Sequence, residues 1–204
     1  MALVRSSTPE VIEEPAGRPS RAVLFMQLSS PDADSRRSAA IELAGDSGAI
    51  AELLAQLADE EDYAVRQAIV SSLSTTGGPE VVQGVMGYLR SEDAGLRNDV
   101  IELLKEQPDA IAPYMPTLLA DPDPDVRIFA VNILESLKHP KVVDWLIAVI
   151  ETDPHINVCA TAVDLLAEVG DSRARVPLAR LEVRFADEPF ITFAVAAALD
   201  KIAA

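Results

Sequence analysis

The sequence predicts an all-α protein, a right-handed α-solenoid of about six helical hairpins over residues 20–204. The first observation behind this prediction is a motif of acidic residues, an arginine and a helix-spaced apolar run, most complete at residues 121–137. The second is its recurrence, with arginines separated by 29, 31 and 30 residues at Arg37, Arg66, Arg97 and Arg127. A fixed period near thirty residues is typical of stacked repeat arrays.

Two looser copies of the motif extend the array to the C-terminus. They lie at residues 158–166 and 191–199, where Cys159 and Thr192 replace the arginine at steps of 32 and 33 residues. A third observation is that the chain has no runs of alternating apolar and polar residues, which half-buried strands would require. The array is therefore expected to be helical throughout.

Each repeat is expected to contain two helices joined by a tight acidic turn. The first helices are predicted at residues 21–29, 49–58, 79–90, 110–120, 140–151 and 173–184. The second helices are predicted at residues 34–44, 63–74, 95–105, 125–138, 156–169 and 189–202. After each arginine, apolar residues fall at positions +3, +4 and +7, as in Ile69, Val70 and Leu73. This spacing builds one apolar face per helix, which a single repeat cannot bury alone.

Turn residues mark the helix boundaries. Glycines are expected to end second helices, since a left-handed residue is usually needed there. Prolines are expected at the start of first helices, where a missing N–H does no harm. One aspartate precedes each of five second helices and can accept from the free N–H groups at its start: Asp32, Asp62, Asp93, Asp123 and Asp153.

Composition excludes several classes of function. The chain is 49% hydrophobic but only 4% aromatic, which suits closely packed small helices better than a cofactor-filled cavity. A net charge of −16 repels phosphate groups, so we predict that the protein binds neither nucleic acid nor membranes. The single cysteine excludes an intrachain disulfide and fits a reducing compartment. Without a signal-peptide pattern or a membrane span, a cytoplasmic location is predicted.

Residues 1–19 are predicted to form a disordered tail. They mix Ser, Pro, Gly and Glu around two apolar pairs, too little to offset the entropy of ordering. A sharper alternative is a short docking peptide, PEVIEEP, in which Val11 and Ile12 enter a groove of a partner.

The motif resembles a known repeat family. D-P-D-P-D-V-R followed by A-V-x-x-L, at residues 121–134, is similar to the HEAT repeat in its short bacterial form, found also in phycobilin-lyase-type proteins. The resemblance covers six repeats over residues 20–204 and weakens in the last two. It implies that the aspartate before each second helix bonds along the stack to the arginine at its start. By position this role falls to Asp62, Asp93 and Asp123 with Arg66, Arg97 and Arg127, as a structural ladder.

The search for catalytic chemistry yields little. His155 and Cys159 stand four residues apart with Asp153 nearby, but a zinc site or an activated thiol would need a third group. Phosphate-binding glycine loops and nucleophile-elbow motifs do not occur in the sequence. We therefore predict that the chain is not an enzyme and holds no metal and no cofactor.

Departures from the repeat pattern suggest a contact surface. The second helices are expected to line the concave side, with polar residues at positions +1 and +5. Ile128 and Phe193 break this rule at +1, with Phe129 and Phe190 close by. These four are candidate partner-binding residues, unless they pack under a neighbouring repeat. Tyr114 and Trp145 occupy equivalent positions in the first helices of two successive repeats. They either form an exposed aromatic pair or pack against the adjacent repeat.

The favoured function is a non-catalytic scaffold or adaptor that binds another protein, with the acidic centre favouring a basic segment of that partner. One alternative is a bilin lyase or isomerase of the HEAT type. Another is a self-assembling structural or regulatory subunit, in which the arginine-rich residues 173–184 of one copy meet the acidic residues 42–62 of another. The oligomeric state is left open.

Overall fold

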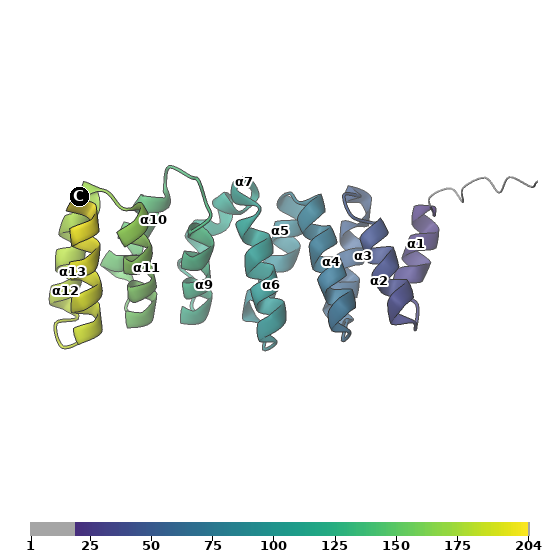
Figure 1. The fold of residues 1–204 in the computed structure, drawn as a ribbon, viewed down its shortest axis with the longest axis horizontal. Coiled ribbons are helices and arrows are strands. Elements are labelled where there is room, and N and C mark those ends of the chain that lie inside the picture. Colours follow the sequence, from purple (N-terminus) through teal and green to yellow (C-terminus); the bar gives the residue numbers. More distant parts are fainter. Residues whose placement is uncertain (1–18, 204) are drawn as a thin grey trace, which may run out of the picture.

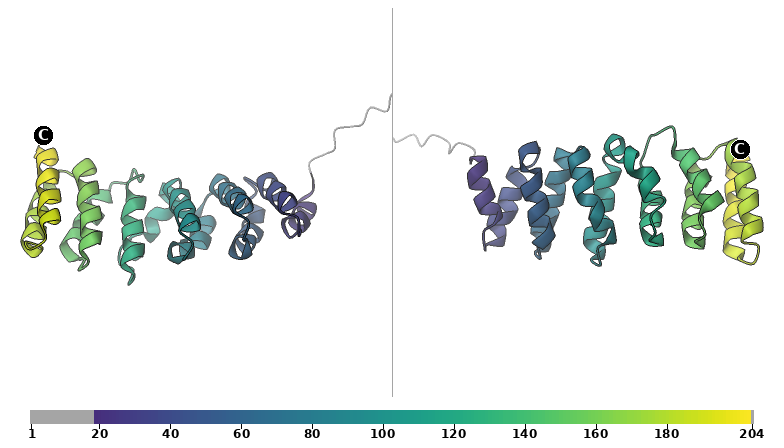
Figure 2. Two further views of the ribbon diagram at one scale, coloured as in Figure 1. Left: turned by 60° about the horizontal axis from the view of Figure 1, so that its bottom comes forward. Right: turned by 180° about the vertical axis from the view of Figure 1, so that it is seen from behind.

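The computed structural model describes residues 19–203, and within these residues it contains helices and no strand. Six pairs of helices stand side by side in one row, with the N-terminal and C-terminal pairs at opposite ends (Figure 1). Seen from another side, the row follows a shallow arc (Figure 2). The predicted all-α solenoid is confirmed. The predicted tail, residues 1–19, and its docking peptide fall outside the described residues except for Pro19.

The second helices form one continuous layer, in which each packs against the next. Their bounds are α2 Ala33–Glu42, α4 Tyr63–Thr76, α6 Ala94–Lys105, α9 Pro124–Leu134, α11 Ile156–Val169 and α13 Pro189–Ala203. Their apolar faces meet the first helices in a single core that runs the length of the row. Ile69, Leu73 and Leu134 belong to this core and are fully buried, as the +3, +4 and +7 spacing predicts.

The first helices are less regular. They are α1 Arg21–Leu28, α3 Ile50–Asp59, α5 Pro79–Val85 with the 3₁₀ turn η2 Met86–Arg90, α7 Pro108–Ile111 with η3 Ala112–Tyr114 and α8 Met115–Leu118, α10 Val142–Thr152 and α12 Arg175–Arg184. Short 3₁₀ turns, η1 Ser47–Ala49 and η4 Ser172–Ala174, precede α3 and α12. The predicted helix at 110–120 is broken into three pieces because Pro113 and Pro116 lack the N–H that a continuous helix would use.

Aspartates begin four of the second helices. Asp62 accepts hydrogen bonds from the N–H groups of Ala64 and Val65 at 2.9 and 3.1 Å, and Asp32, Asp93 and Asp123 cap α2, α6 and α9 in the same way. Asp153 differs from the prediction. It lies two residues before the cap position and accepts from the His155 N–H at 2.8 Å, while its carboxylate also accepts from Arg127 of the neighbouring repeat.

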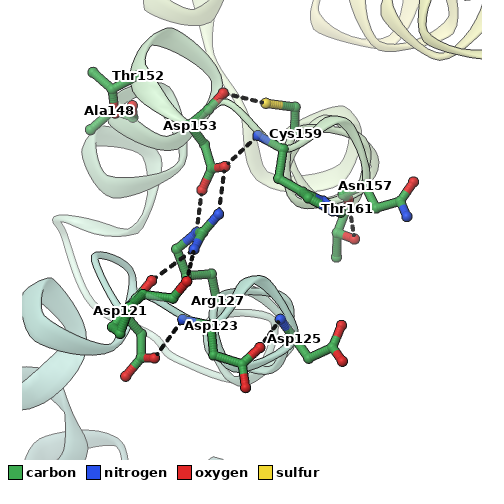
Figure 3. A network of polar contacts seen from close by, with 12 residues as sticks. Asp121, Asp123, Asp125, Arg127, Ala148, Thr152, Asp153, Asn157, Cys159 and Thr161 are labelled. Carbon is green, nitrogen blue, oxygen red and sulfur yellow. Dashed lines mark hydrogen bonds and ion pairs between the residues drawn. The ribbon is translucent and has the colours of Figure 1, made fainter.

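Arginines at the start of second helices join successive repeats, and Arg127, which is buried, shows this most completely (Figure 3). Its Nη1 donates to the carbonyls of Asp121 and Pro122, at 2.7 and 3.3 Å, within its own repeat. Its Nε and Nη2 donate to both carboxylate oxygens of Asp153, at 2.6 and 3.0 Å, in the following repeat. One guanidinium therefore fixes two successive turns, and its bidentate geometry sets their relative position.

Arg36 makes the same contacts at the start of the row. It donates to the carbonyl of Ser30 at 2.8 Å and to both oxygens of the Glu60 carboxylate at 2.8 and 2.9 Å. The first repeat is therefore anchored by Arg36, and the prediction that placed Arg37 there is one residue out of register. The anchor must reach the carbonyl six residues before it, and Arg37 is exposed on the other side of the helix.

The predicted aspartate partners need correction. Arg66 forms an ion pair with Asp93, as the resemblance implies. Asp62 and Asp123, however, accept from backbone N–H groups at the start of their helices. The carboxylates that accept hydrogen bonds from Arg36 and Arg127 belong to Glu60 and Asp153. Both residues lie two positions before the cap residue of the next second helix. Asp93 both caps α6 and receives Arg66, whereas in the other two turns the earlier residue faces the preceding repeat.

Arg97 is the weak rung of the ladder. It donates to the Ser91 carbonyl at 2.6 Å, and its guanidinium carbon lies 5.3 Å from the centre of the Phe129 ring. Asp121, which occupies the expected carboxylate position, is paired with Arg90. Within residues 19–203 the buried Nε of Arg97 finds no hydrogen-bond partner. A cation–π contact therefore stands where the other repeats have a carboxylate.

The fifth repeat lacks an anchor arginine, and an arginine of the sixth repeat takes its place. The Cys159 Sγ reaches the Asp153 carbonyl at 3.4 Å but cannot span two turns as an arginine does, and Arg184 of α12 approaches from the following repeat. Arg184 donates to the carbonyls of Glu151 and Asp153 at 2.8 and 3.0 Å, and its Nη2 lies 3.2 Å from the Cys159 Sγ. The same turn is thus held by a guanidinium that comes from the other side.

Acid should weaken the first rung in a defined pH range. The hydrogen-bonded ion pair with Arg36 lowers the pKa of Glu60 from 4.5 to about 2, with smaller contributions from the Asp62 N–H and the Gln56 amide and against the effect of burial. A lowered pKa in the folded state stabilises the protein above pH 4.5, and this stability is lost as the pH falls toward 2. Glu60→Gln should lower the unfolding free energy by about 3 kcal/mol at neutral pH. Urea unfolding of both proteins should show this difference disappear near pH 2, and a pH-independent difference would contradict the account.

Removing one partner of the buried rung should be far more harmful than removing an exposed one. Arg127→Met leaves Asp153 buried without its partner, which should lower the unfolding free energy by about 3–5 kcal/mol. The control is Arg173→Met, whose partners Asp144 and Asp171 are largely exposed and whose loss should cost at most about 1 kcal/mol. Urea unfolding followed by circular dichroism measures both. Equal losses would show that the ladder contributes no more than a surface ion pair.

Candidate functional site

The layer of second helices forms one broad surface, which we call the second-helix surface. Grooves run along it between neighbouring helices. Their volumes are about 370 Å³ between α2 and α4, about 430 Å³ between α4 and α6, and about 230 Å³ between α9 and α11. These grooves form because neighbouring helices contact each other through their buried residues. Their outer residues, which lie five and eight or nine positions after the anchor residue, stand further apart.

The groove between α9 and α11 combines an apolar floor with a charged rim. Val131 and Leu165 are buried and form the floor. Glu135, directly after α9, and Asp164 and Glu168 of α11 are exposed at the rim. Asp164 and Glu168 lie four residues apart, so that both project from the same side of α11. The arrangement can hold a ligand rich in N–H groups over an apolar surface.

The groove between α4 and α6 is also acidic. Gln67 donates a hydrogen bond to Asp99, and Ser74 donates one to Glu106. Burial raises the pKa of Asp99, against the lowering effect of the Gln67 hydrogen bond. These contacts join neighbouring repeats across the groove floor.

A lysine links the two acidic regions. Lys105 of α6 donates to Glu102 at 3.0 Å and to Glu135, directly after α9, at 3.4 Å. Its side chain is largely covered, whereas both glutamates are well exposed. The carboxylates therefore dominate the outer part of the surface.

The predicted contact residues divide into two groups. Ile128 of α9 and Phe190 and Phe193 of α13 lie on or beside the second-helix surface, and the two phenylalanines are 46% and 77% exposed. Phe129 is half-buried beneath Arg97 and belongs to the repeat ladder. Its ring completes the weak rung, so we remove it from the candidate partner-binding residues.

Tyr114 and Trp145 do not form the exposed aromatic pair that their spacing allowed. Tyr114 lies in η3 and packs against the core, with its side chain half-buried. Trp145 of α10 stacks on His139, with ring centres 4.9 Å apart and planes 8° from parallel. The packing alternative describes both residues, and both belong to the first-helix row.

Cys159 is a core residue. It is fully buried, its Sγ lies 3.4 Å from the Asp153 carbonyl, and burial raises the pKa of its thiol against the effect of Arg184. Among residues 19–203, no group of three or more His, Cys, Asp or Glu side chains is arranged to hold a metal ion. In the same part of the chain, no helix has the length and apolar character needed to cross a membrane.

Sequence reasoning missed several residues that matter. Glu60 and Arg184 complete the ladder, although neither recurs with the repeat period. The carboxylates of the grooves were counted as net charge and were not recognised as the rim of a surface. Their spacing on α11 was visible in the sequence, but their position relative to α9 depends on how the repeats stack.

Comparison with known proteins identifies relatives of this chain. A relative from Pseudanabaena tenuis (strain PCC 7409), described as an uncharacterized phycocyanin operon protein Z, is 29% identical over 160 residues, covering 73% of this chain and 78% of the relative. A solved structure of the CpcE and CpcF complex of phycocyanin lyase from Nostoc sp. PCC7120 is 21% identical, covers 84% of this chain and 86% of the matched chain, and has a TM-score of 0.40. The crystal structure of an engineered protein is 18% identical, covers 89% and 96% of the two chains, and has a TM-score of 0.44.

These findings correct the prediction that the chain is not an enzyme. That prediction rested on missing catalytic motifs, yet a protein similar to this chain is described as a phycocyanin operon protein. Missing motifs do not exclude an enzymatic role in such a chain, and the exclusion is withdrawn.

The repeat motif, the paired helices and the arginine ladder all describe one architecture. A family model for HEAT repeats matches residues 22–105 and 111–200, which together span most of the chain. The chain belongs to the HEAT-repeat family.

Proposed function

We propose that this chain is a lyase-type HEAT-repeat protein that takes part in transferring a bilin to or from a phycobiliprotein. The observation that carries the proposal is the similarity to the phycocyanin operon protein, which extends over about three quarters of both chains. This function corresponds to the bilin lyase alternative, and it includes the binding of a protein partner.

The groove between α9 and α11 has the chemistry that such a ligand requires. A bilin is an open-chain tetrapyrrole, whose flat rings are apolar and whose nitrogens carry N–H donors. Glu135, Asp164 and Glu168 can accept hydrogen bonds from these nitrogens, and the floor of Val131 and Leu165 can cover a ring face. Hydrogen bonds to charged acceptors are stronger than neutral ones, which favours this pairing.

The size of the groove supports a transfer role. Its volume of about 230 Å³ is smaller than pockets that enclose a small molecule, which begin at about 300 Å³. The groove can hold one part of a bilin and leaves the remainder open to a second protein. A shallow, open site suits a protein that passes its ligand on.

Bilin binding should depend on the groove carboxylates. Purified chain added to phycocyanobilin should shift and sharpen the visible absorbance of the bilin in a saturable way. The double variant Asp164→Asn/Glu168→Gln should bind at least about tenfold more weakly, since each hydrogen bond to a charged acceptor contributes about 1.5 kcal/mol.

The matched control is Glu80→Gln, which removes an exposed carboxylate from α5 in the first-helix row. This variant should bind as the unchanged chain does. An absorbance spectrum that the chain leaves unaltered, or equal losses in the groove and control variants, would contradict the proposal.

A further inference from the structure

An apolar strip crosses the second-helix surface in the last three repeats. Ile128, Ala160 and Phe193 occupy the position directly after the anchor residue in α9, α11 and α13. In α4 and α6 the same position holds the polar residues Gln67 and Asn98. Since α9, α11 and α13 pack side by side, the three apolar residues follow one another across the surface.

Phe190, one turn before Phe193, widens this strip at the C-terminal end. Of the five phenylalanines in the sequence, these two are exposed, by 46% and 77%. Phe25, Phe129 and Phe185 are half-buried against the core. Ile128 and Ala160 are half-buried and pack against the core, so the exposed apolar area is concentrated at the two phenylalanines. A cluster of exposed large apolar side chains marks a contact surface more often than scattered ones do. We call Ile128, Ala160, Phe190 and Phe193 the apolar strip.

Carboxylates lie along one side of the strip. Further along are Glu135, directly after α9, Asp164 and Glu168 of α11, and Asp200 of α13, all exposed. We call these four residues the acidic flank, and its charge is only partly offset by Lys201 beside Asp200 and by Lys105, which pairs with Glu135. A surface of this sign attracts a basic partner and repels nucleic acid and anionic lipid.

The spacing of the strip indicates the conformation of the partner. Packed helices lie about 8–10 Å apart, so successive residues of the strip are separated by about that distance. Seven residues of an α-helix rise about 10.5 Å. Apolar residues at i, i+7 and i+14 of a helix lying across α9, α11 and α13 would each meet one of these positions.

We propose that the apolar strip and the acidic flank together bind an amphipathic helix of a partner protein, one with an apolar stripe and a row of Lys or Arg along its edge. The stripe covers Ile128, Ala160 and the two phenylalanines, and the basic row faces the carboxylates. Amphipathic helices bind grooves through such regularly spaced apolar anchors. The acidic flank shares Glu135, Asp164 and Glu168 with the proposed bilin groove. This inference therefore concerns the same surface as the proposed function, and it rests on that function only in this respect.

A synthetic peptide tests the proposal without any bilin. The probe is a fluorescein-labelled helical peptide of 18 residues, with leucines at i, i+7 and i+14, lysines along one edge and alanine or glutamine elsewhere. Fluorescence anisotropy with the full chain should show saturable binding at low salt that weakens at physiological salt. The same peptide with glutamate for lysine should not bind.

Two variants with matched exposure locate the surface. Phe193→Asp should weaken peptide binding at least about tenfold, because it places a charge where the apolar stripe docks. Val183→Asp changes a residue of α12 that is 78% exposed, compared with 77% for Phe193, and should leave binding unchanged. Both variants should retain the circular dichroism spectrum of the unchanged chain, since neither side chain is buried.

Three results would overturn the proposal: no binding of the basic peptide at low salt, equal binding of the acidic peptide, or equal losses in the two variants. The outcome is separable from that of the bilin experiment. Phe193→Asp lies outside the groove between α9 and α11, so a chain that binds bilin but not the peptide would refute only this inference. A chain that binds the peptide but not bilin would refute only the proposed function.

Discussion

The arginine that spans two successive turns is the interaction on which the structure depends. Arg127 and Arg36 each satisfy the carbonyls of their own turn and a carboxylate of the next. A largely buried guanidinium cannot be left unpaired without a large cost, so in these two repeats the arginine fixes the position of the following repeat. Apolar faces alone would allow helices to slide against one another, whereas a bidentate ion pair accepts one geometry.

The ladder also separates structure from function within each repeat. Its arginines and carboxylates lie in the turns at the start of the second helices, and the core lies between the two helix layers. Exposed positions further along the second helices belong to neither the ladder nor the core, so they can vary without loss of the fold. In this chain they carry exposed carboxylates from α6 onward and apolar residues at the start of α9, α11 and α13. The two features make a surface that suits a basic, partly apolar partner, and a groove that suits an N–H-rich ligand.

Local pattern was enough to predict the helices, and it failed where contacts join different repeats. The period near thirty residues and the spacing of Ile69, Val70 and Leu73 gave the correct fold class. The cap aspartates recur in four of the turns, so they were chosen as ladder partners, whereas Glu60 and Asp153 at the earlier position are not one residue type. Arg36 and Arg37 are adjacent in sequence, and only the turn geometry distinguishes them. Arg184 reaches back from the next repeat, a contact that no periodic signal reports. The exposure of Phe193 against the burial of Phe129 likewise depends on three-dimensional neighbours.

We propose that the protein partner of the second-helix surface is itself a phycobiliprotein, bound at the C-terminal repeats. Hydroxyl-radical footprinting, read by mass spectrometry with and without purified phycocyanin subunits, tests it most directly. Phe193 of α13 and Met26 of α1 are both 77% exposed, so each reports on its own region from the same starting accessibility. The account predicts that phycocyanin slows the oxidation of Phe193 and Phe190 and leaves that of Met26 unchanged. Protection of Met26 alone, or of neither residue at saturating phycocyanin, would contradict it.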